Sequence, residues 1–400
     1  MNITGIITEY NPLHNGHLYH IINSKKITKC DGVVCVMSGN FVQRGTPAII
    51  DKWNRTKLAL ANGVDLVIEL PSIYSLSSAE FFAYGAVSLL NNLGNINNLC
   101  FGSESGNINT IKEIAKILVE EPDDFKYNLK LSLDKGISFP LARSSALSKC
   151  FDDNSHISEI LNSSNNILAI EYCKSLIKLN STIIPFTIHR KGSSYNNLNI
   201  DNIFCSASAI RKHLKENRDI ASLKSVIPSE TYDILKKMQQ KNSLTFEEEI
   251  FKYIKYKIFT TNNKLENIPD VSEGLHNKIY KCIKDSINYT DLILNVKSKR
   301  YTQTRINRIL CQYFIGFDEY NTQTLRKASC PYARILGFNK KGQEILRKFK
   351  ISSSIPLYTK LPKQRNEVLN LEIQSTQAYS LLNKTISPYD DYKISPIRLL

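Results

Sequence analysis

The stretch GIITEYNPLHNGHLYHI, residues 5–21, decides the fold of this chain of 400 residues. It opens with an apolar run that ends at Ile7, continues through a loop that holds Asn11 and Pro12, and closes in a segment of helical composition. The order strand, loop, helix is typical of the first unit of a parallel α/β sheet. At the start of such a helix the backbone N–H groups lack partners and the peptide dipoles align, so this turn favours a bound phosphate.

His14 and His17 mark the start of the expected helix. They share one of its faces, and Gly16 removes the side chain that would hold a phosphate away from the backbone. Histidines at this spacing are also common as surface or packing residues; the preceding strand and the glycine favour a site. The motif HxGH resembles the signature of the nucleotidylyltransferase superfamily, which includes class I aminoacyl-tRNA synthetases and pantothenate synthetase. The resemblance implies that both histidines stabilise charge on an α-phosphate while pyrophosphate leaves.

Strand patterns alternate with helical patterns over the first half of the chain. Strands are expected at residues 31–37, 64–70, 96–101 and 182–189, and helices at 51–62, 78–90 and up to about 118. This alternation predicts right-handed crossovers and an α/β fold with a parallel sheet covered on both faces. We expect a Rossmann-like, nucleotidylyltransferase-like domain that binds ATP over residues 1–215. Strand patterns fade beyond it, which predicts a mainly helical, basic region over residues 216–400.

A second phosphate-binding turn is expected where the last predicted strand ends. Arg190 follows that strand, and SASAIR, residues 206–211, opens the next helix with Ser208 and Arg211. Free N–H groups at a helix start and a guanidinium together suit a triphosphate. As a capping pattern alone this is common, but beside HxGH it resembles the second signature of the same superfamily.

The positive charge of the chain lies in its last third. Residues 1–250 carry 26 basic and 25 acidic side chains, whereas residues 251–400 carry 26 and 12, so +14 of the net +15 belongs to the later part. Between Lys297 and Lys350, 13 basic residues stand against three acidic ones. This asymmetry predicts a polyanionic partner, with nucleic acid ahead of an acidic membrane surface or solubility alone.

The compartment follows from what the sequence lacks. No apolar run approaches the length of a membrane span, and no signal peptide precedes the first strand. The nine cysteines form no CxxC pair, so we expect reduced core residues rather than a zinc or redox site. These features predict a cytoplasmic chain with no membrane partner.

A set of motifs along the chain points to one family. They are EYNPLHNGH, SGNFVQRGTPA, GVDLVIELP, FGSE, SSNNILAIEY, SASAIR, SEGL and YTQTRINRIL. Together they resemble the tRNA(Met) cytidine acetate ligases over nearly the whole chain. The resemblance implies a ligase that uses ATP to activate acetate as acetyl-adenylate, releases pyrophosphate, and acetylates the exocyclic amine of the wobble cytidine of elongator tRNA(Met).

The expected site residues follow from the motifs and the charge. The catalytic residues are His14 and His17. Contacts to ATP are expected from Ile7, Thr8, Glu9, Tyr10, Asn11, Pro12, Leu13, His14, Asn15, Gly16, His17, Leu18, Tyr19, His20, Gly102, Asn165, Arg190, Ser208 and Arg211. ATP is expected as a co-substrate accompanied by Mg²⁺, with no dedicated metal ligands in the chain. Contacts to tRNA phosphates are expected from Lys297, Lys299, Arg300, Arg305, Arg308 and Arg326.

The acetate pocket and the rival functions stay open at this point. Ser38, Asn40, Gln43 and Arg44 lie at the expected sheet edge, but an ordinary polar loop explains them equally well. One rival is a nucleotidylyltransferase that moves AMP onto a small phosphorylated acceptor, which would not need a basic helical region. The other is a non-catalytic RNA-binding protein with this fold. The complete HxGH motif argues against it, because a protein without catalysis would be free to lose these residues.

Overall fold

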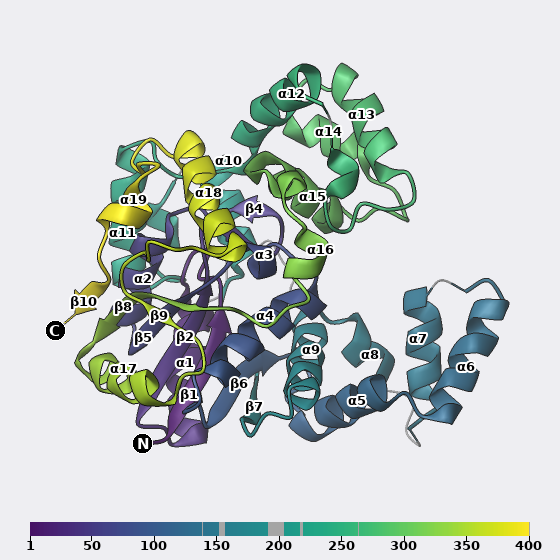
Figure 1. The fold of residues 1–400 in the computed structure, drawn as a ribbon, viewed down its shortest axis with the longest axis horizontal. Coiled ribbons are helices and arrows are strands. Elements are labelled where there is room, and N and C mark those ends of the chain that lie inside the picture. The colour runs from purple at the N-terminus through teal and green to yellow at the C-terminus, as the bar shows by residue number, and fades with distance from the viewer. Residues whose placement is uncertain (138, 152–156, 191–203, 217–218, 263, 400) are drawn as a thin grey trace.

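A computed structural model of the chain shows a central sheet surrounded by helices (Figure 1). The structure describes residues 1–137, 139–151, 157–190, 204–216, 219–262 and 264–399. The sheet runs in the order β10-β8-β5-β2-β1-β6-β7, with β9 beside β8, and β3 and β4 form a separate hairpin. The strands are β1 (Ile3–Thr8), β2 (Gly32–Ser38), β3 (Phe41–Val42), β4 (Thr46–Pro47), β5 (Leu66–Leu70), β6 (Asn98–Ser103), β7 (Ile184–His189), β8 (Ala333–Asn339), β9 (Leu357–Tyr358) and β10 (Ile397–Leu399).

Helices fill most of the remaining chain. They are α1 (Asn15–Thr28), α2 (Lys52–Ala61), α3 (Ser72–Ser75), α4 (Ala79–Asn92), α5 (Ile108–Glu120), α6 (Asp123–Asp134), α7 (Phe139–Ser148), α8 (Ile157–Asn162), α9 (Ser164–Lys178), α10 (Ala207–Glu216), α11 (Ser229–Gln240), α12 (Ile250–Thr260), α13 (Leu275–Asp285), α14 (Tyr289–Val296), α15 (Gln303–Ile315), α16 (Thr322–Leu325), α17 (Lys340–Ser352), α18 (Glu367–Leu382) and α19 (Asp390–Lys393). Short 3₁₀ turns lie at Ala221–Leu223, Glu247–Glu249, Leu265–Asn267 and Phe317–Glu319.

The parallel part of the sheet confirms the predicted α/β fold. β1 pairs in parallel with β2 and β6, β2 with β5, and β6 with β7. Alternate residues of a strand point to opposite faces, so each strand feeds two cores. Val34 and Val36 belong to one core with helices α4 and α9, whereas Val33 and Cys35 belong to the other with α1, α2, α10 and α11. Burial on both faces explains why the strands read as continuous apolar runs.

The C-terminal part of the chain adds strands that the sequence patterns did not predict. β8 pairs antiparallel with β5, and β9 and β10 pair with β8, so a sheet begun at Ile3 is completed near the end of the chain. The sequence of β8, ARILGFN, is short and contains a glycine. It therefore gives only a weak strand pattern between segments with helical patterns. The boundary near residue 215 stays a prediction, because this sheet draws on both sides of it.

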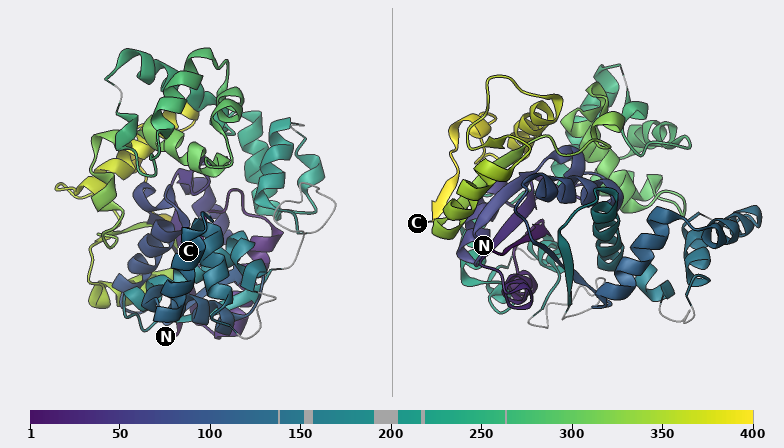
Figure 2. Two further views of the ribbon diagram at one scale, coloured as in Figure 1. Left: turned by 90° about the vertical axis from the view of Figure 1, so that its right-hand side faces the viewer. Right: turned by 60° about the horizontal axis from the view of Figure 1, so that its bottom comes forward.

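Two helical groups extend from the sheet (Figure 1). Helices α12–α15 stand together beyond the end at which the parallel strands finish, and both further views keep them there (Figure 2). Helices α6 and α7 pack on each other and project to one side. Among the described residues, no helix is both long and apolar enough to cross a membrane. All nine cysteines are free, and Cys35, Cys100 and Cys311 are fully buried.

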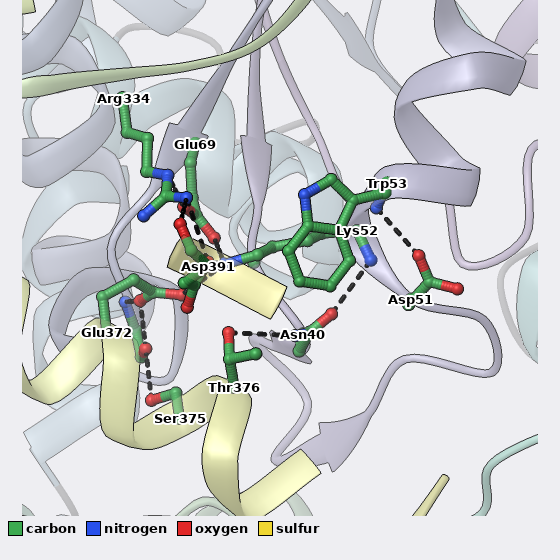
Figure 3. A network of polar contacts seen from close by, with 12 residues as sticks. Asn40, Asp51, Lys52, Trp53, Glu69, Arg334, Glu372, Ser375, Thr376 and Asp391 are labelled. Atoms are coloured by element: carbon green, nitrogen blue, oxygen red, sulfur yellow. Dashed lines mark hydrogen bonds and ion pairs between the residues drawn. The ribbon is translucent and has the colours of Figure 1, made fainter. Parts of the chain in front are cut away.

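A buried network of charges joins segments from the first and the last quarter of the chain (Figure 3). Lys52 Nζ on α2 lies 2.6 Å from Glu69 Oε1 on β5 and 2.8 Å from Asp391 Oδ1 on α19. Arg334 Nη2 on β8 lies 3.2 Å from the same Asp391 oxygen. Burial, together with the Glu69 carboxylate, raises the pKa of Glu372 well above its usual range. With Glu372 neutral, two cations face two carboxylates in a dry interior.

Removing the Lys52 charge should therefore destabilise the fold. Lys52→Met keeps most of the side-chain volume but leaves buried carboxylates without their cation, a change that typically costs about 3–5 kcal/mol. Urea denaturation measures the free energy of unfolding. Lys57→Met, on the exposed side of the same helix, should change it by no more than about 0.5 kcal/mol. Equal stabilities of the two variants would contradict a stabilising role for the network.

Candidate nucleotide and acyl-transfer site

A cavity of about 440 Å³ opens where the parallel strands end. Its lining includes Ile7, Thr8 and Glu9 after β1, Gly102 in β6, and Arg190 after β7. The chain leaves β1 toward β2 on one side of it and later returns to β6 on the other. Such a divergence of connections is where ligands bind in open α/β sheets.

His14 and His17 lie side by side at this opening. Their ring centroids are 3.8 Å apart, and the two planes are tilted by 31°. His14 Nδ1 accepts a hydrogen bond from Gly16 N at 3.0 Å, and His17 Nδ1 accepts one from His14 N at 3.3 Å. The histidines thus cap the first turn of α1 in a reciprocal way. Because each Nδ1 holds a lone pair toward the backbone, each neutral ring carries its proton on Nε2.

Gly16 makes room for the His14 ring. A Cβ atom at this position would lie 2.8 Å from His14 Cε1, closer than non-bonded atoms approach. The sequence predicted that this glycine admits a phosphate; the structure adds that it admits the capping imidazole.

The histidines are neutral donors in the ATP-free chain. Burial, with Arg190 and Arg211 nearby, lowers the pKa of His14 to about 3. Burial, followed by the neighbouring His14 and Arg190, lowers the pKa of His17 well below its usual range. An uncharged Nε2–H pair can donate two hydrogen bonds to one phosphate without first losing protons.

His20, on α1, is the third histidine that lines the cavity. Its Nε2 is buried without a hydrogen-bond partner in the described part of the chain. Burial and the charge of Arg190 lower its pKa to about 4. A buried polar atom without a partner is costly, so this nitrogen is placed for a ligand or water.

Two arginines bring charge to the same side of the cavity. Arg211 Nη1 donates to the Asn11 carbonyl at 2.6 Å, and its Nη2 donates to Ser208 Oγ at 3.2 Å. This fixes the α10 arginine against the loop that precedes His14. Arg190 packs beside Gly102, where a Cβ atom would lie 3.2 Å from Arg190 Cγ. A glycine here lets the arginine side chain cross the end of β6.

Asn165 lies at the start of α9 and lines the cavity. Its backbone N and Nδ2 both donate to Glu104 Oε1, at 3.2 and 2.7 Å, and Asn166 N donates to Glu104 Oε2 at 2.8 Å. The Glu104 carboxylate therefore satisfies the first N–H groups of α9 and orients Asn165.

The structure brings most of the predicted nucleotide residues together. The cavity is lined by Ile7, Thr8, Glu9, His14, Gly16, His17, Tyr19, His20, Gly102, Asn165, Arg190, Ser208 and Arg211. The other predicted residues, which are Tyr10, Asn11, Pro12, Leu13, Asn15 and Leu18, are not part of this lining. Tyr10 and Leu13 are core residues, and Asn11 Oδ1 accepts from Ile49 N at 2.8 Å. These positions support the loop, and their contact with ATP stays a prediction.

The predicted tRNA-binding residues fall into two groups. Lys297, Lys299 and Arg300 are exposed between α14 and α15. Arg326, in contrast, is 7% exposed, pairs with Asp270 Oδ1 at 2.8 Å and lies over the Phe81 ring. Burial of this kind makes a contact from Arg326 to a phosphate a weaker prediction than one from the exposed group.

Two further predicted tRNA contacts, Arg305 and Arg308, are half-buried and already bonded or paired within the chain. Arg305 donates to the Asp270 carbonyl at 2.8 and 3.0 Å. Arg308 has a side chain only 16% exposed and lines the cavity instead of the outer surface. The cavity also contains Arg44 and Thr304, which the sequence did not assign to it; SGNFVQRGTPA and YTQTRINRIL were the signals that could have placed them.

Comparison with known proteins agrees with this geometry. Residues 1–393 match the HIGH Nucleotidyl Transferase family. A tRNA(Met) cytidine acetate ligase of Clostridium novyi is 62% identical to the chain over 399 residues, covering 100% of both. The chain belongs to the tRNA(Met) cytidine acetate ligase family. The ligase of Clostridium tetani is 54% identical, covering 99% of this chain and 100% of its own.

Solved structures of the ligase family share the fold. The apo crystal structure of Thermotoga maritima TmcAL superposes with a TM-score of 0.92 at 34% identity, covering 100% of both chains. The same protein bound with alpha-thio ATP gives a TM-score of 0.90 at 33% identity, covering 100% of this chain and 99% of the other. Membership of the ligase family, suggested by the sequence motifs, is thereby confirmed.

The protonation state of the site gives a test that needs no substrate. An unfolded histidine has a pKa of about 6.5, so unfolding at acid pH takes up protons that folded His14 and His20 exclude. Their contribution to stability is complete above about pH 6.5. It is lost as the pH falls toward the folded-state pKa, which is about 4 for His20 and about 3 for His14. Histidine ¹⁵N NMR of the ATP-free chain should show both rings neutral at pH 5. A His14 ring that titrates near pH 6.5 would contradict the buried, capping geometry.

Proposed function

We propose that the chain is an ATP-dependent ligase that acetylates the exocyclic amine of the wobble cytidine of elongator tRNA(Met). The observation that carries the proposal is the pair of neutral Nε2–H donors, His14 and His17, at the mouth of a cavity that also holds Arg190 and Arg211. Membership of the ligase family supports the same substrates. The alpha-thio ATP in the Thermotoga maritima relative supports ATP as the nucleotide here.

The first step joins acetate to AMP. An acetate oxygen attacks the α-phosphorus of ATP, the bond to the bridging oxygen breaks, and pyrophosphate leaves with that electron pair. His14 and His17 donate hydrogen bonds to the α-phosphate oxygens as charge builds on them. Arg190 and Arg211 neutralise the triphosphate.

We place Mg²⁺ with ATP as part of the substrate. Among the described residues, no group of three or more His, Cys, Asp or Glu side chains could hold a metal ion. Mg²⁺ commonly binds through substrate phosphates and water, with few protein ligands. Mg²⁺ bound to ATP would reduce the repulsion between the phosphates and the carboxylate of acetate, while His14 and His17 donate hydrogen bonds to the α-phosphate.

The second step transfers the acetyl group to the tRNA. The cytidine amine attacks the carbonyl carbon of acetyl-adenylate, AMP leaves, and the amine loses a proton. Thr304 and Arg308 of α15 line the cavity, so the basic helical region borders the reacting atoms. A tRNA held on this region could present one nucleotide to the cavity, a reaction that we place in the cytoplasm.

Transfer of labelled acetate to unmodified elongator tRNA(Met), with ATP and Mg²⁺, tests the function. The chain should label the tRNA only when ATP is present. His17→Ala should lower the rate about 100-fold to 1000-fold, the usual effect of losing one donor to a developing oxyanion. His213→Ala, on α10 with its ring bonded to the Asp219 carbonyl and outside the cavity lining, is the matched control and should keep normal activity.

The possible outcomes separate the rival functions. Normal acetylation by His17→Ala would remove HxGH from the mechanism. Release of pyrophosphate with a small phosphorylated acceptor, and none with acetate, would favour a nucleotidylyltransferase. RNA binding without either reaction would favour a non-catalytic protein.

We also propose that the exposed group formed by Lys297, Lys299 and Arg300 binds tRNA phosphates. Changing all three to glutamine should lower the slope of log affinity against log salt by up to about 2–3, since each phosphate contact contributes about 0.7–0.9. Filter binding from 50 to 300 mM salt measures it, with the tRNA affinity of the unaltered chain as reference. The control removes as many exposed charges near α6, at Lys126, Lys130 and Lys135. Equal slopes for the two triple variants would refute this placement.

A further inference from the structure

One end of the cavity is built from two segments that lie far apart in sequence. Arg44 comes from the turn between β3 and β4, and Arg308 comes from α15. Gly45, at a φ of +75°, lies so close to α15 that a Cβ atom there would be 2.1 Å from Arg308 N. Cys311 Sγ also donates to the Gly45 carbonyl at 3.0 Å. The turn is thus fixed against the helix, and the backbones of Arg44 and Arg308, which both line the cavity, lie close together.

The cavity as a whole carries an excess of positive charge. Of the described residues that line the cavity, Arg44, Arg190, Arg211 and Arg308 are arginines, whereas Glu9 is the one carboxylate. Glu9 Oε1 accepts from Gln43 N at 2.8 Å. Burial lowers the pKa of Arg44 and of Arg211, and the nearby Glu9 carboxylate partly offsets this effect, so one carboxylate of the lining serves more than one arginine.

Arg308 Nη2 lies 3.8 Å from Asp270 Oδ2. The other oxygen of the same carboxylate, Oδ1, lies closer to Arg326, at 2.8 Å from its Nη1. Arg308 Nε is buried with no hydrogen-bond partner in the described part of the chain. A partly buried cation of this kind favours an anionic ligand.

Apolar groups also line the cavity close to α15, because Gln312 Nε2 of α15 donates to the carbonyl of Leu76, shortly before α4, at 2.7 Å. Ala79, at the first position of α4, and Phe82, one turn later, both line the cavity, and Phe82 is 3% exposed. Arginine forks match a carboxylate in geometry and charge, and an alanine with an aromatic ring suits a short alkyl group. A small carboxylate satisfies both demands, whereas a phosphate has no apolar part.

We propose that Arg44 and Arg308 bind the carboxylate of acetate, with Ala79 and Phe82 against its methyl group. This inference rests on the proposed function and assigns its acyl substrate to a place. Gln43 links the turn to Glu9, in the same loop as His14, so the carboxylate lies on the side of the cavity that adjoins the histidine pair. The phosphates have other partners in Arg190, which follows β7, and in Ser208 and Arg211 of α10.

Kinetics with the full chain, ATP, Mg²⁺ and tRNA test the assignment. Arg44→Gln and Arg308→Gln should each raise KM for acetate about 10-fold to 100-fold, the range that one charge-assisted hydrogen bond supplies. KM for ATP and for tRNA should change by less than about 3-fold. Arg365→Gln, an exposed arginine outside the cavity lining, is the matched control and should leave all three constants unchanged.

A change of acyl specificity separates binding from mere structural support. Ala79→Leu should reduce the use of acetate while retaining formate, because the added carbons occupy the space of the methyl group. Phe82→Ala should admit propionate and butyrate with a rising ratio of kcat/KM to that for acetate. Circular dichroism and thermal unfolding of each variant check that it folds, and the ratio within one variant is independent of the amount of folded protein.

The outcomes separate a failure of the acetate subsite from a failure of the proposed function. If the unaltered chain acetylates no tRNA, the proposed function fails. If it does acetylate tRNA, and Arg44→Gln and Arg308→Gln leave KM for acetate unchanged, the acetate subsite is overturned. A rise in KM for ATP instead would assign the two arginines to phosphate, and a rise in KM for tRNA would assign them to the nucleic acid.

Discussion

The chemistry of this protein depends on how the first turn of α1 satisfies its backbone N–H groups. Two imidazoles accept those hydrogen bonds through Nδ1, at 3.0 and 3.3 Å. The same bonds leave each proton on Nε2 and fix both ring orientations. Burial then holds the rings neutral, with the pKa of His14 near 3. A helix cap therefore sets the tautomer, direction and charge of the groups that face the cavity, and the proposed catalysis needs no further arrangement of them.

The second requirement is that the C-terminal part of the chain returns to the sheet. β8 extends it beside β5, and Lys52 joins Glu69 to Asp391 across the seam. Each of these charges loses water on burial, so the network is stable only when every member has its counter-charge. Glu372 fits this scheme as a neutral acid, because burial and the facing Glu69 carboxylate raise its pKa, even though its Oε2 accepts a hydrogen bond from Ser72 N at 2.5 Å. The return of the chain also packs α18 against α15 and α3, which seats α15 over the cavity.

The positive charges of the cavity come from several elements. Arg190 and Arg211 lie near His14, whereas Arg44 and Arg308 belong to segments that are fixed against each other through Gly45. Burial lowers the pKa of the Arg44 and Arg308 guanidinium groups, yet an arginine remains protonated across the physiological range. The positive charge of such a cavity attracts anions in general and does not distinguish one anion from another. Selection then follows from local shape and from the apolar surface that each anion must cover.

The sequence by itself determined the parallel α/β fold of the first strands, the helix start at His14 and His17 that lines the cavity, and membership of a ligase family. These features are local, because strand runs, caps and motif spacing are written in adjacent residues. It could not place β8, whose short run with glycine is a strand only because β5 offers an antiparallel partner. Nor could it distinguish Arg326, buried over Phe81, from Lys297 on the surface, since the two carry the same charge. The position of Arg308 depends on Gly45, 263 residues earlier in the chain. Only the tertiary structure decided such matters, because burial and long-range packing depend on contacts that no sequence window contains.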